Sequence, residues 1–151
     1  MDGLTINLLR PINPLPVGND FDKTFFDIKK TRTNDYKVSM KNVELFKNSI
    51  NGSIGTTGVV VYEAPIGSSA TVIGVNVANA NSNNISVSVM MRDISANKVV
   101  YVVKDALIVP GSSNVLVGGE QKLVLESGDF LSVTSSLANS ADVIVSVLEI
   151  T

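Results

Sequence analysis

The chain has 151 residues, of which 44% are hydrophobic and 17% charged, with a mean hydropathy of +0.28 and a net charge of −2, a balance typical of one globular domain with or without an arm. It contains no histidine, cysteine or tryptophan, which excludes Ser-His-Asp and Cys-His catalysis, thiolate or imidazole metal sites and disulfides. No apolar run approaches the ~20 residues that cross a bilayer, and no secretion signal opens the chain, so we expect neither a membrane span nor export.

The first third of the chain differs from the rest. Residues 1–50 carry eight Lys/Arg and six Asp/Glu, and they hold five of the eight aromatic residues. Residues 51–151 carry four Lys/Arg and eight Asp/Glu. Turn-forming residues fill positions 48–58, so we place a boundary near residue 50.

Residues 1–50 are interpreted as an extended N-terminal docking arm. Three of the five prolines lie between residues 8 and 16, and each removes a backbone donor and disfavours helix. The segment is also apolar, so it must lie on its own domain or on a neighbouring chain. The candidate interface residues of the arm are Leu4, Ile6, Leu8, Leu9, Ile12, Leu15, Phe21, Phe25 and Phe26.

Two further elements are expected inside the arm. Phe21, Phe25 and Ile28 fall at helical spacing, which predicts a short helix. Residues 36–46 fit a strand, with Tyr36, Val38 and Met40 alternating, or a short helix, and both alternatives stay open.

Residues 51–151 show the period-two alternation of strands that bury one face. Turns rich in Gly, Pro, Asn and Ser recur every 8–12 residues or so, which is typical of a sandwich or jelly roll. We therefore predict an all-β fold: an antiparallel β-sandwich or jelly-roll-like domain of eight or nine strands. The expected strands cover residues 58–63, 71–77, 85–89, 97–105, 107–109, 115–117, 122–126, 130–134 and 143–150.

Two local patterns in this domain carry specific expectations. Residues 97–105 are apolar on both faces, which predicts a central strand. Gly118-Gly119 precedes a strand pattern and predicts a hairpin turn rather than a phosphate-binding loop.

No catalytic, cofactor or metal site is predicted. The carboxylates fall mostly where strands end or turn, where acids serve local hydrogen bonding. A calcium loop beginning at Asp20 fails because Phe25 and Thr31 stand where the loop needs glycine and a bidentate acid. Basic residues of the arm are interspersed with acids, so we expect neither a nucleic-acid partner nor a membrane partner. The carboxylates considered are Asp93, Asp105, Glu120, Glu126, Asp129 and Asp142.

Residues 71–150 resemble small β-sandwich virion structural proteins of tailed bacteriophages, especially those of marine and cyanobacterial phages. The resemblance is carried by Lys104-Asp105-Ala106, Val109-Pro110, Gly118 to Glu126, Gly128-Asp129 and the closing Val147 to Ile150. It implies a non-enzymatic building block present in many copies, made in the host cytoplasm and located in the virion. It transfers no catalytic residue.

The first hypothesis is therefore a virion structural protein that assembles through its arm, as a head decoration (cement) protein or as a neck, tail or fibre-adaptor protein. Its expected partners are other virion proteins of the capsid, neck or tail and further copies of itself, in a homo-oligomer such as a trimer. The alternative is a carbohydrate-binding β-sandwich used for adsorption to a host surface. An enzyme is the third and weakest hypothesis.

Overall fold

The computed structural model describes residues 26–30, 36–40 and 42–151, with side chains from residue 42 onward. The chain divides into a first unit, residues 1–42, and a second unit, residues 43–151. In the first unit, β1 (Phe26–Lys30) pairs antiparallel with β2 (Tyr36–Met40), which places Ile28 opposite Val38. The strand alternative for residues 36–40 is thus confirmed.

The short helix expected from Phe21 to Ile28 is wrong over its described part. Phe26 and Ile28 belong to β1, whereas Phe21 and Phe25 lie outside the described residues. Phe26 and Ile28 alternate with Asp27 and Lys29, so the same residues also satisfy a period-two pattern, and pairing with β2 decides between the two periods.

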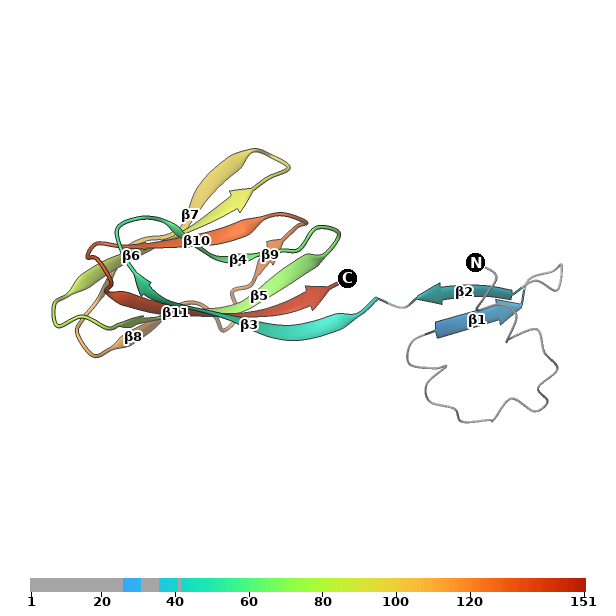
Figure 1. The fold of residues 1–151 in the computed structure, drawn as a ribbon, viewed down its shortest axis with the longest axis horizontal. Coiled ribbons are helices and arrows are strands. Elements are labelled where there is room, and N and C mark those ends of the chain that lie inside the picture. The colour runs from blue at the N-terminus through green and yellow to red at the C-terminus, as the bar shows by residue number, and fades with distance from the viewer. Residues whose placement is uncertain (1–25, 31–35, 41) are drawn as a thin grey trace. The chain divides into compact units, whose positions relative to one another are not determined.

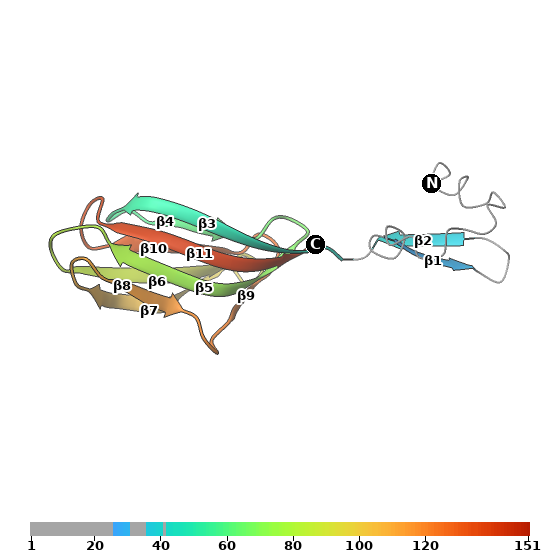
Figure 2. The same cartoon turned by 90° about the horizontal axis from the view of Figure 1, so that it is seen from below.

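The second unit consists of two antiparallel sheets, which confirms the expected all-β sandwich (Figure 1). The four-stranded sheet has the order β4–β10–β6–β7, with bounds Val59–Glu63, Phe130–Ser135, Ile85–Asp93 and Lys98–Ile108. The five-stranded sheet has the order β3–β11–β5–β8, with β9 also on β5, and bounds Glu44–Ile54, Ala141–Ile150, Ser69–Asn79, Ser113–Val117 and Leu123–Leu125. Figure 2 shows β3, β11, β5 and β8 side by side. Among the described residues, no helix is long and apolar enough to span a membrane.

The core lies between the two sheets and is built from alternate residues of each strand. In β11, for example, Val143, Val145 and Val147 are buried while Asp142 and Ile144 are exposed. β-branched residues dominate, as expected for pleated, half-buried strands. The large buried side chains are Ile54, Val61, Val72, Val75, Val77, Ile85, Val87, Val89, Ile108, Val117, Leu125, Leu131, Val133, Val143, Val145 and Val147.

The position of β7 contradicts the expectation of a central strand. β7 pairs only with β6 and forms an edge of the four-stranded sheet. Its apolar residues Val99, Val100 and Tyr101 are each more than half exposed. An apolar run on both faces is usual for a strand with neighbours on both sides, and the described residues of this chain supply one neighbour.

The Gly118-Gly119 hairpin is also wrong, because β8 and β9 do not pair with each other. Both pair antiparallel with β5, through Val117 opposite Val75 and Leu123 opposite Val72. Gly119 has φ of +62°, and a side chain at Gly118 would come within 2.6 Å of the Val115 Cγ1 atom. The two glycines therefore serve a loop that interrupts one edge of the five-stranded sheet.

The boundary expected at residue 50 falls inside β3. This strand pairs with β11 from Glu44, opposite Ile150, to Ile54, opposite Ala141. It contains many Asn, Ser and Gly residues, which an edge strand tolerates because half of its surface faces solvent. The polar run at residues 48–54 is thus strand rather than linker.

Candidate interaction surfaces

Most of the large exposed apolar side chains of the sandwich lie in its strands. On the five-stranded sheet, Ile50, Ile144 and Val115 form one row across β3, β11, β5 and β8, with Asn76 of β5 between them. A second row runs from Phe46 through Leu148 and Thr71 to Val124. We call these two rows the outer face. Phe46 is 80% exposed, Ile50 70% and Val115 69%, so this face presents apolar area to solvent.

A groove separates the two rows of the outer face. The residues between the rows are small or polar: Asn48 pairs with Ser146, which pairs with Gly74. The register shifts after Ser146, which leaves Ile73 of β5 without a directly opposed partner. The resulting groove has a volume of about 590 Å³ and is lined by Phe46, Lys47, Asn48, Ile73, Ser146 and Val147.

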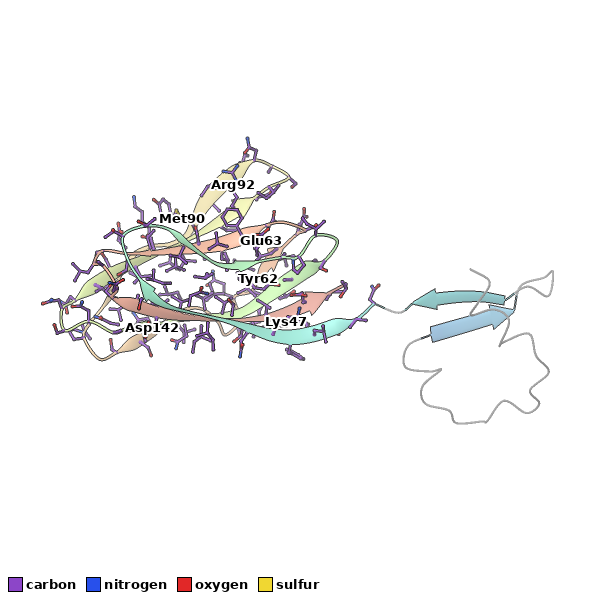
Figure 3. The ribbon with its side chains drawn as sticks, viewed as in Figure 1. Lys47, Tyr62, Glu63, Met90, Arg92 and Asp142 are labelled. Carbon is purple, nitrogen blue, oxygen red and sulfur yellow. The ribbon has the colours of Figure 1, made fainter. Side chains whose placement is uncertain are left out.

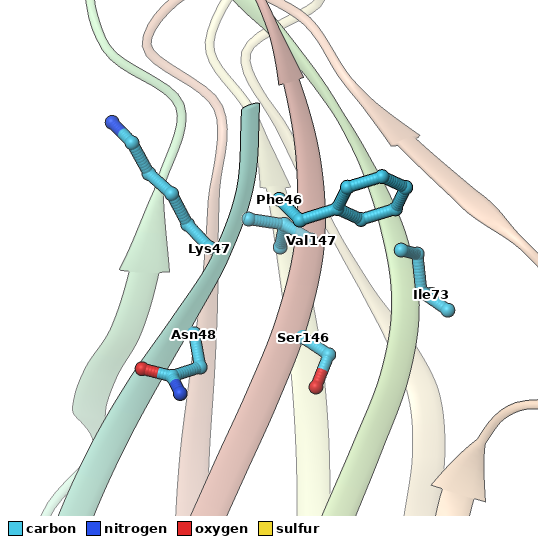
Figure 4. Close-up of a pocket in the computed structure, with 6 residues that line it drawn as sticks. All are labelled: Phe46, Lys47, Asn48, Ile73, Ser146 and Val147. Atoms are coloured by element: carbon cyan, nitrogen blue, oxygen red, sulfur yellow. The ribbon is translucent and has the colours of Figure 1, made fainter. Parts of the chain in front are cut away.

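The groove is apolar at one end and polar at the other. Figure 4 shows the Phe46 ring reaching across β11 toward Ile73, while Lys47 points away from it. Asn48 and Ser146 lie together at the other end. An exposed aromatic ring beside amide and hydroxyl groups can stack against a flat apolar surface and offer hydrogen bonds at the same time.

The β6–β7 hairpin presents a second apolar surface, which extends beyond the rest of the sandwich at its turn (Figure 1). Asp93 closes the turn by accepting hydrogen bonds from Ala96 N at 2.7 Å and Ser95 Oγ at 2.8 Å. The bond from the Ala96 backbone, followed by that from Ser95, lowers the pKa of Asp93. Arg92 donates to Asn97 Oδ1 at 2.6 Å across the turn, so the hairpin end is held by its own side chains (Figure 3).

One buried carboxylate connects the two sheets. Glu149 of β11, 5% exposed, accepts a hydrogen bond from Lys47 Nζ at 2.7 Å and one from Tyr62 Oη at 2.9 Å. Lys47 and Tyr62 come from β3 and β4, strands of different sheets (Figure 3). The Lys47 ammonium lowers the pKa of Glu149, and burial together with the Glu149 carboxylate raises the pKa of Tyr62. Every oxygen of this cluster has a partner, which is how a buried charge is retained in a fold.

Asp129 joins three loops at one end of the sandwich. Its side chain, in a residue 1% exposed, accepts hydrogen bonds from Ile94 N at 2.9 Å and Glu126 N at 3.0 Å. Its backbone carbonyl accepts from Ala64 N at 2.9 Å. The β6–β7 turn, the β9–β10 turn and the end of β4 are therefore fastened to one residue.

The carboxylates considered for chemistry are spread over the fold. Asp105 lies within β7 at φ of +53° and exchanges hydrogen bonds with Ser88, at 3.0 Å from its backbone nitrogen and 3.2 Å to its carboxylate. Among residues 42–151, no group of three or more His, Cys, Asp or Glu side chains stands close enough to hold a metal ion. The others lie in turns or near strand ends: Asp93, Glu120, Glu126, Asp129 and Asp142.

The interface residues expected in the arm lie outside the residues whose side chains the structure describes: Leu4, Ile6, Leu8, Leu9, Ile12, Leu15, Phe21, Phe25 and Phe26. The outer face was not predicted. The sequence pattern places Phe46 and Ile50 in the arm, and for Val115 and Val124 it predicts strand without an interaction surface. In an alternating strand, the positions that face solvent usually carry polar residues. The apolar residues at positions 46, 50 and 144 occupy such positions, and this departure is the signal in the sequence for the outer face.

No protein-family model and no curated protein matches the chain. Among solved structures, the chain is similar to a protein of Bacillus endospore appendages, described as disulfide-linked pili, with a TM-score of 0.46 and 11% identity over 74% of this chain and 90% of that chain. It is also similar to the infectious bursal disease virus VP2 subviral particle, with a TM-score of 0.40 and 12% identity over 76% of this chain and 38% of that chain. For the Gx strain of that virus the TM-score is 0.38, with 10% identity over 83% of this chain and 42% of that chain.

The chain spans about two fifths of the length of these bursal disease virus chains. Similarity at this level does not indicate a shared function.

Proposed function

We propose that this chain is a non-enzymatic structural protein that assembles with copies of itself and with other proteins of a particle. The observation that carries the proposal is the exposure of apolar side chains in regular strands of both sheets, among them Phe46, Ile50, Val100 and Val115. Soluble monomers rarely leave contiguous apolar surface or a long apolar edge strand uncovered, because both promote association. We therefore infer that other subunits cover these apolar surfaces in the assembled particle.

The particle we propose is the virion of a tailed bacteriophage. The resemblance of residues 71–150 to virion β-sandwich proteins supports this assignment. A chain without cysteine also suits a particle that persists outside cells, since it has no thiol to oxidise. The proposed stations are head decoration or a neck, tail or fibre adaptor.

Quantitative mass spectrometry of purified virions tests this proposal and separates the stations. A decoration protein is expected in many copies per particle, and an adaptor in a few. Absence of the chain from purified virions would contradict the proposal.

We further propose that the segment preceding β3 docks on another subunit, which makes the N-terminus essential for assembly. Deleting residues 1–19 is expected to abolish incorporation into particles and to leave the thermal unfolding of the sandwich unchanged. The reason is that this segment contributes apolar residues such as Leu8 and Leu9, while the sandwich core is complete from β3 onward. Incorporation is measured by mass spectrometry of particles, and unfolding by circular dichroism.

Point variants give this prediction a matched control. Leu8→Ser with Leu9→Ser is expected to weaken incorporation, whereas Asn7→Ser with Asn13→Ser is expected to leave it unchanged, because only the first pair removes apolar area. Normal occupancy of the truncated chain would show that the arm does not dock.

The groove on the outer face favours a second candidate function, the binding of a carbohydrate on a host surface. Phe46 supplies an exposed aromatic platform, and Asn48 and Ser146 supply hydrogen-bonding groups beside it. The expected result on a glycan array is binding by the full chain that falls at least tenfold in Phe46→Ala. Val60→Ala is the control, because Val60 is exposed on β4 of the other sheet. Signals no higher than background for the full chain would eliminate this candidate.

A further inference from the structure

Within the part of the chain that the structure describes, β7 is an edge strand with one unpaired backbone edge and apolar side chains on both faces. Val99 and Tyr101 stand opposite Arg92 and Met90 of β6 on one face, where Lys104 Nζ lies 5.1 Å from the centre of the Tyr101 ring. Val100 stands opposite Met91, whose side chain packs on the core, and so belongs to the other face. These three residues are 51%, 54% and 55% exposed for Val99, Tyr101 and Val100 respectively.

Between Lys98 and the bulge at Val102, the apolar residues of β7 are exposed on both faces and their outer backbone edge pairs with no described strand. β6 and β7 remain paired as far as Asp93, which stands opposite Lys98. On the other side of β6, β10 reaches only to Arg92, so the hairpin end extends past β10. Proline and inward-pointing charge are absent from Val99, Val100 and Tyr101 themselves, and a strand of this kind is a template for a further strand.

We propose that two copies of this chain join through their β7 edges, antiparallel and about a twofold axis at Val100, to make one continuous sheet from their two four-stranded sheets. The inference rests on the self-assembly proposed above and names the surface that performs it. A twofold axis perpendicular to the sheets keeps each side chain on its own face. Such an axis runs midway between the two copies of one residue, which then stand directly opposite each other.

Charge and register select Val100 as that residue. An axis at Tyr101 would place Lys98 opposite Lys104 of the second copy, and like charges directly opposite destabilise a strand pair. An axis at Val100 places Val99 opposite Tyr101 of the second copy twice, which is a favourable pairing of a β-branched with an aromatic side chain. Lys98 then stands opposite Val102, and no charge meets a like charge.

The irregularity of β7 limits the pairing to this segment. The register with β6 shifts between Val89, opposite Val103, and Met90, opposite Tyr101, so Val102 has no directly opposed residue. Pairing about Val100 uses residues 98–102 and ends at this bulge. An axis at Tyr101 or further along β7 would extend across it, and an axis at Val99 would pair only residues 98–100 of the strand. The exposed residues Val99, Val100 and Tyr101 therefore lie in a part of β7 that pairs with β6 in regular register.

Cysteine cross-linking in the full-length chain tests the pairing, because the chain has no cysteine of its own. In the proposed register the two Val100 positions are directly opposite, at a Cα separation of about 4.5–5.5 Å, within the range that a disulfide spans. Val100→Cys is expected to form a disulfide-linked dimer on mild oxidation, at least tenfold faster than Gln121→Cys, the exposed control in the loop between β8 and β9. Val99→Cys and Tyr101→Cys should each react slowly alone and cross-link when mixed, since like positions are about 7–8 Å apart on the diagonal.

Sedimentation of the unsubstituted chain separates this inference from the proposed function. Self-association of that chain without preferential Val100→Cys cross-linking would overturn the β7 pairing and leave assembly standing. A chain that stays monomeric at all concentrations, with no Val100→Cys dimer, would contradict both. Self-association with the Val100→Cys dimer and the mixed Val99→Cys and Tyr101→Cys product supports the proposed register.

Discussion

Replacing Asp129 by alanine is expected to lower the free energy of unfolding of the sandwich by about 3 kcal/mol, since a hydrogen bond to a charged group contributes roughly 1.5–3 kcal/mol and Asp129 accepts two. The donors are Ile94 N at 2.9 Å and Glu126 N at 3.0 Å. With the carboxylate gone, both backbone groups lose their acceptor in a part-buried site. Denaturant unfolding followed by circular dichroism measures the loss.

Two variants calibrate this prediction. Asp129→Asn keeps one acceptor oxygen and should lose about half as much stability. Asp142→Ala is the surface control, because that exposed carboxylate accepts one bond, from Ser53 N at 3.0 Å, and should cost less than about 1 kcal/mol. Equal losses for Asp129→Ala and Asp142→Ala would show that the Asp129 side chain does not fasten the two turns that contain Ile94 and Glu126.

A local readout connects Asp129 to the proposed β7 surface. Asp129 holds the turn that follows β6, so its loss should speed amide hydrogen exchange at Ile94 and along the hairpin end, more than in the core strands. The same variant should also slow the cross-linking of Val100→Cys, because the hairpin end would no longer be ordered before pairing. Loss of the Asp129 carboxylate is therefore expected to lower both the stability of the sandwich and the rate of pairing through β7.

Most strands from β4 onward could be predicted because they bury alternate residues. Alternation in Val143, Val145 and Val147, for example, appears in the sequence and survives as a buried row in β11. Asp129 illustrates what alternation does not provide. Its position in a turn could be predicted, but only one of its two donors, Glu126 N, belongs to that turn. The other donor, Ile94 N, belongs to the β6–β7 turn, 35 positions away.

Strand partners could not be predicted, since they depend on contacts between segments far apart in sequence. Residues 97–105 have the composition of a central strand and lie at an edge. The glycines before β9 suit a hairpin, yet β8 and β9 both pair with β5. β3 has the composition of a linker because its polar residues face solvent at the edge of a sheet.

These errors share a physical origin that bears on the candidate surfaces. The hydrophobic pattern indicates whether a side chain is buried. It does not indicate whether the same chain or another chain buries it. Val100 and Tyr101 satisfy the pattern of a covered strand while this chain leaves them exposed. The mistaken prediction for β7 is therefore itself an argument for a second copy at that edge.

Lys47→Met is expected to lower the free energy of unfolding by about 1–2 kcal/mol at pH 7, because it removes the cation beside a buried carboxylate. The value is set below that of a fully buried pair because the Lys47 side chain is 46% exposed and partly screened by water, while that of Glu149 is 6% exposed. In the variant, Tyr62 Oη remains as a donor to Glu149 at 2.9 Å. The methionine keeps most of the aliphatic length of lysine, so lost packing contributes little.

Acid should erase this difference. The folded-state pKa of Glu149 is lowered by Lys47, so its ionised form stabilises the fold above the unfolded pKa of about 4.3, and that contribution is lost as the pH falls through the lower folded value. The gap between the original chain and Lys47→Met should therefore narrow as Glu149 is protonated. Glu149→Gln supplies the double-mutant cycle: in that background Lys47→Met should cost less than about 0.5 kcal/mol at any pH. A penalty for Lys47→Met that is the same at pH 7 and below the titration of Glu149 would place its cause in packing rather than in the ion pair.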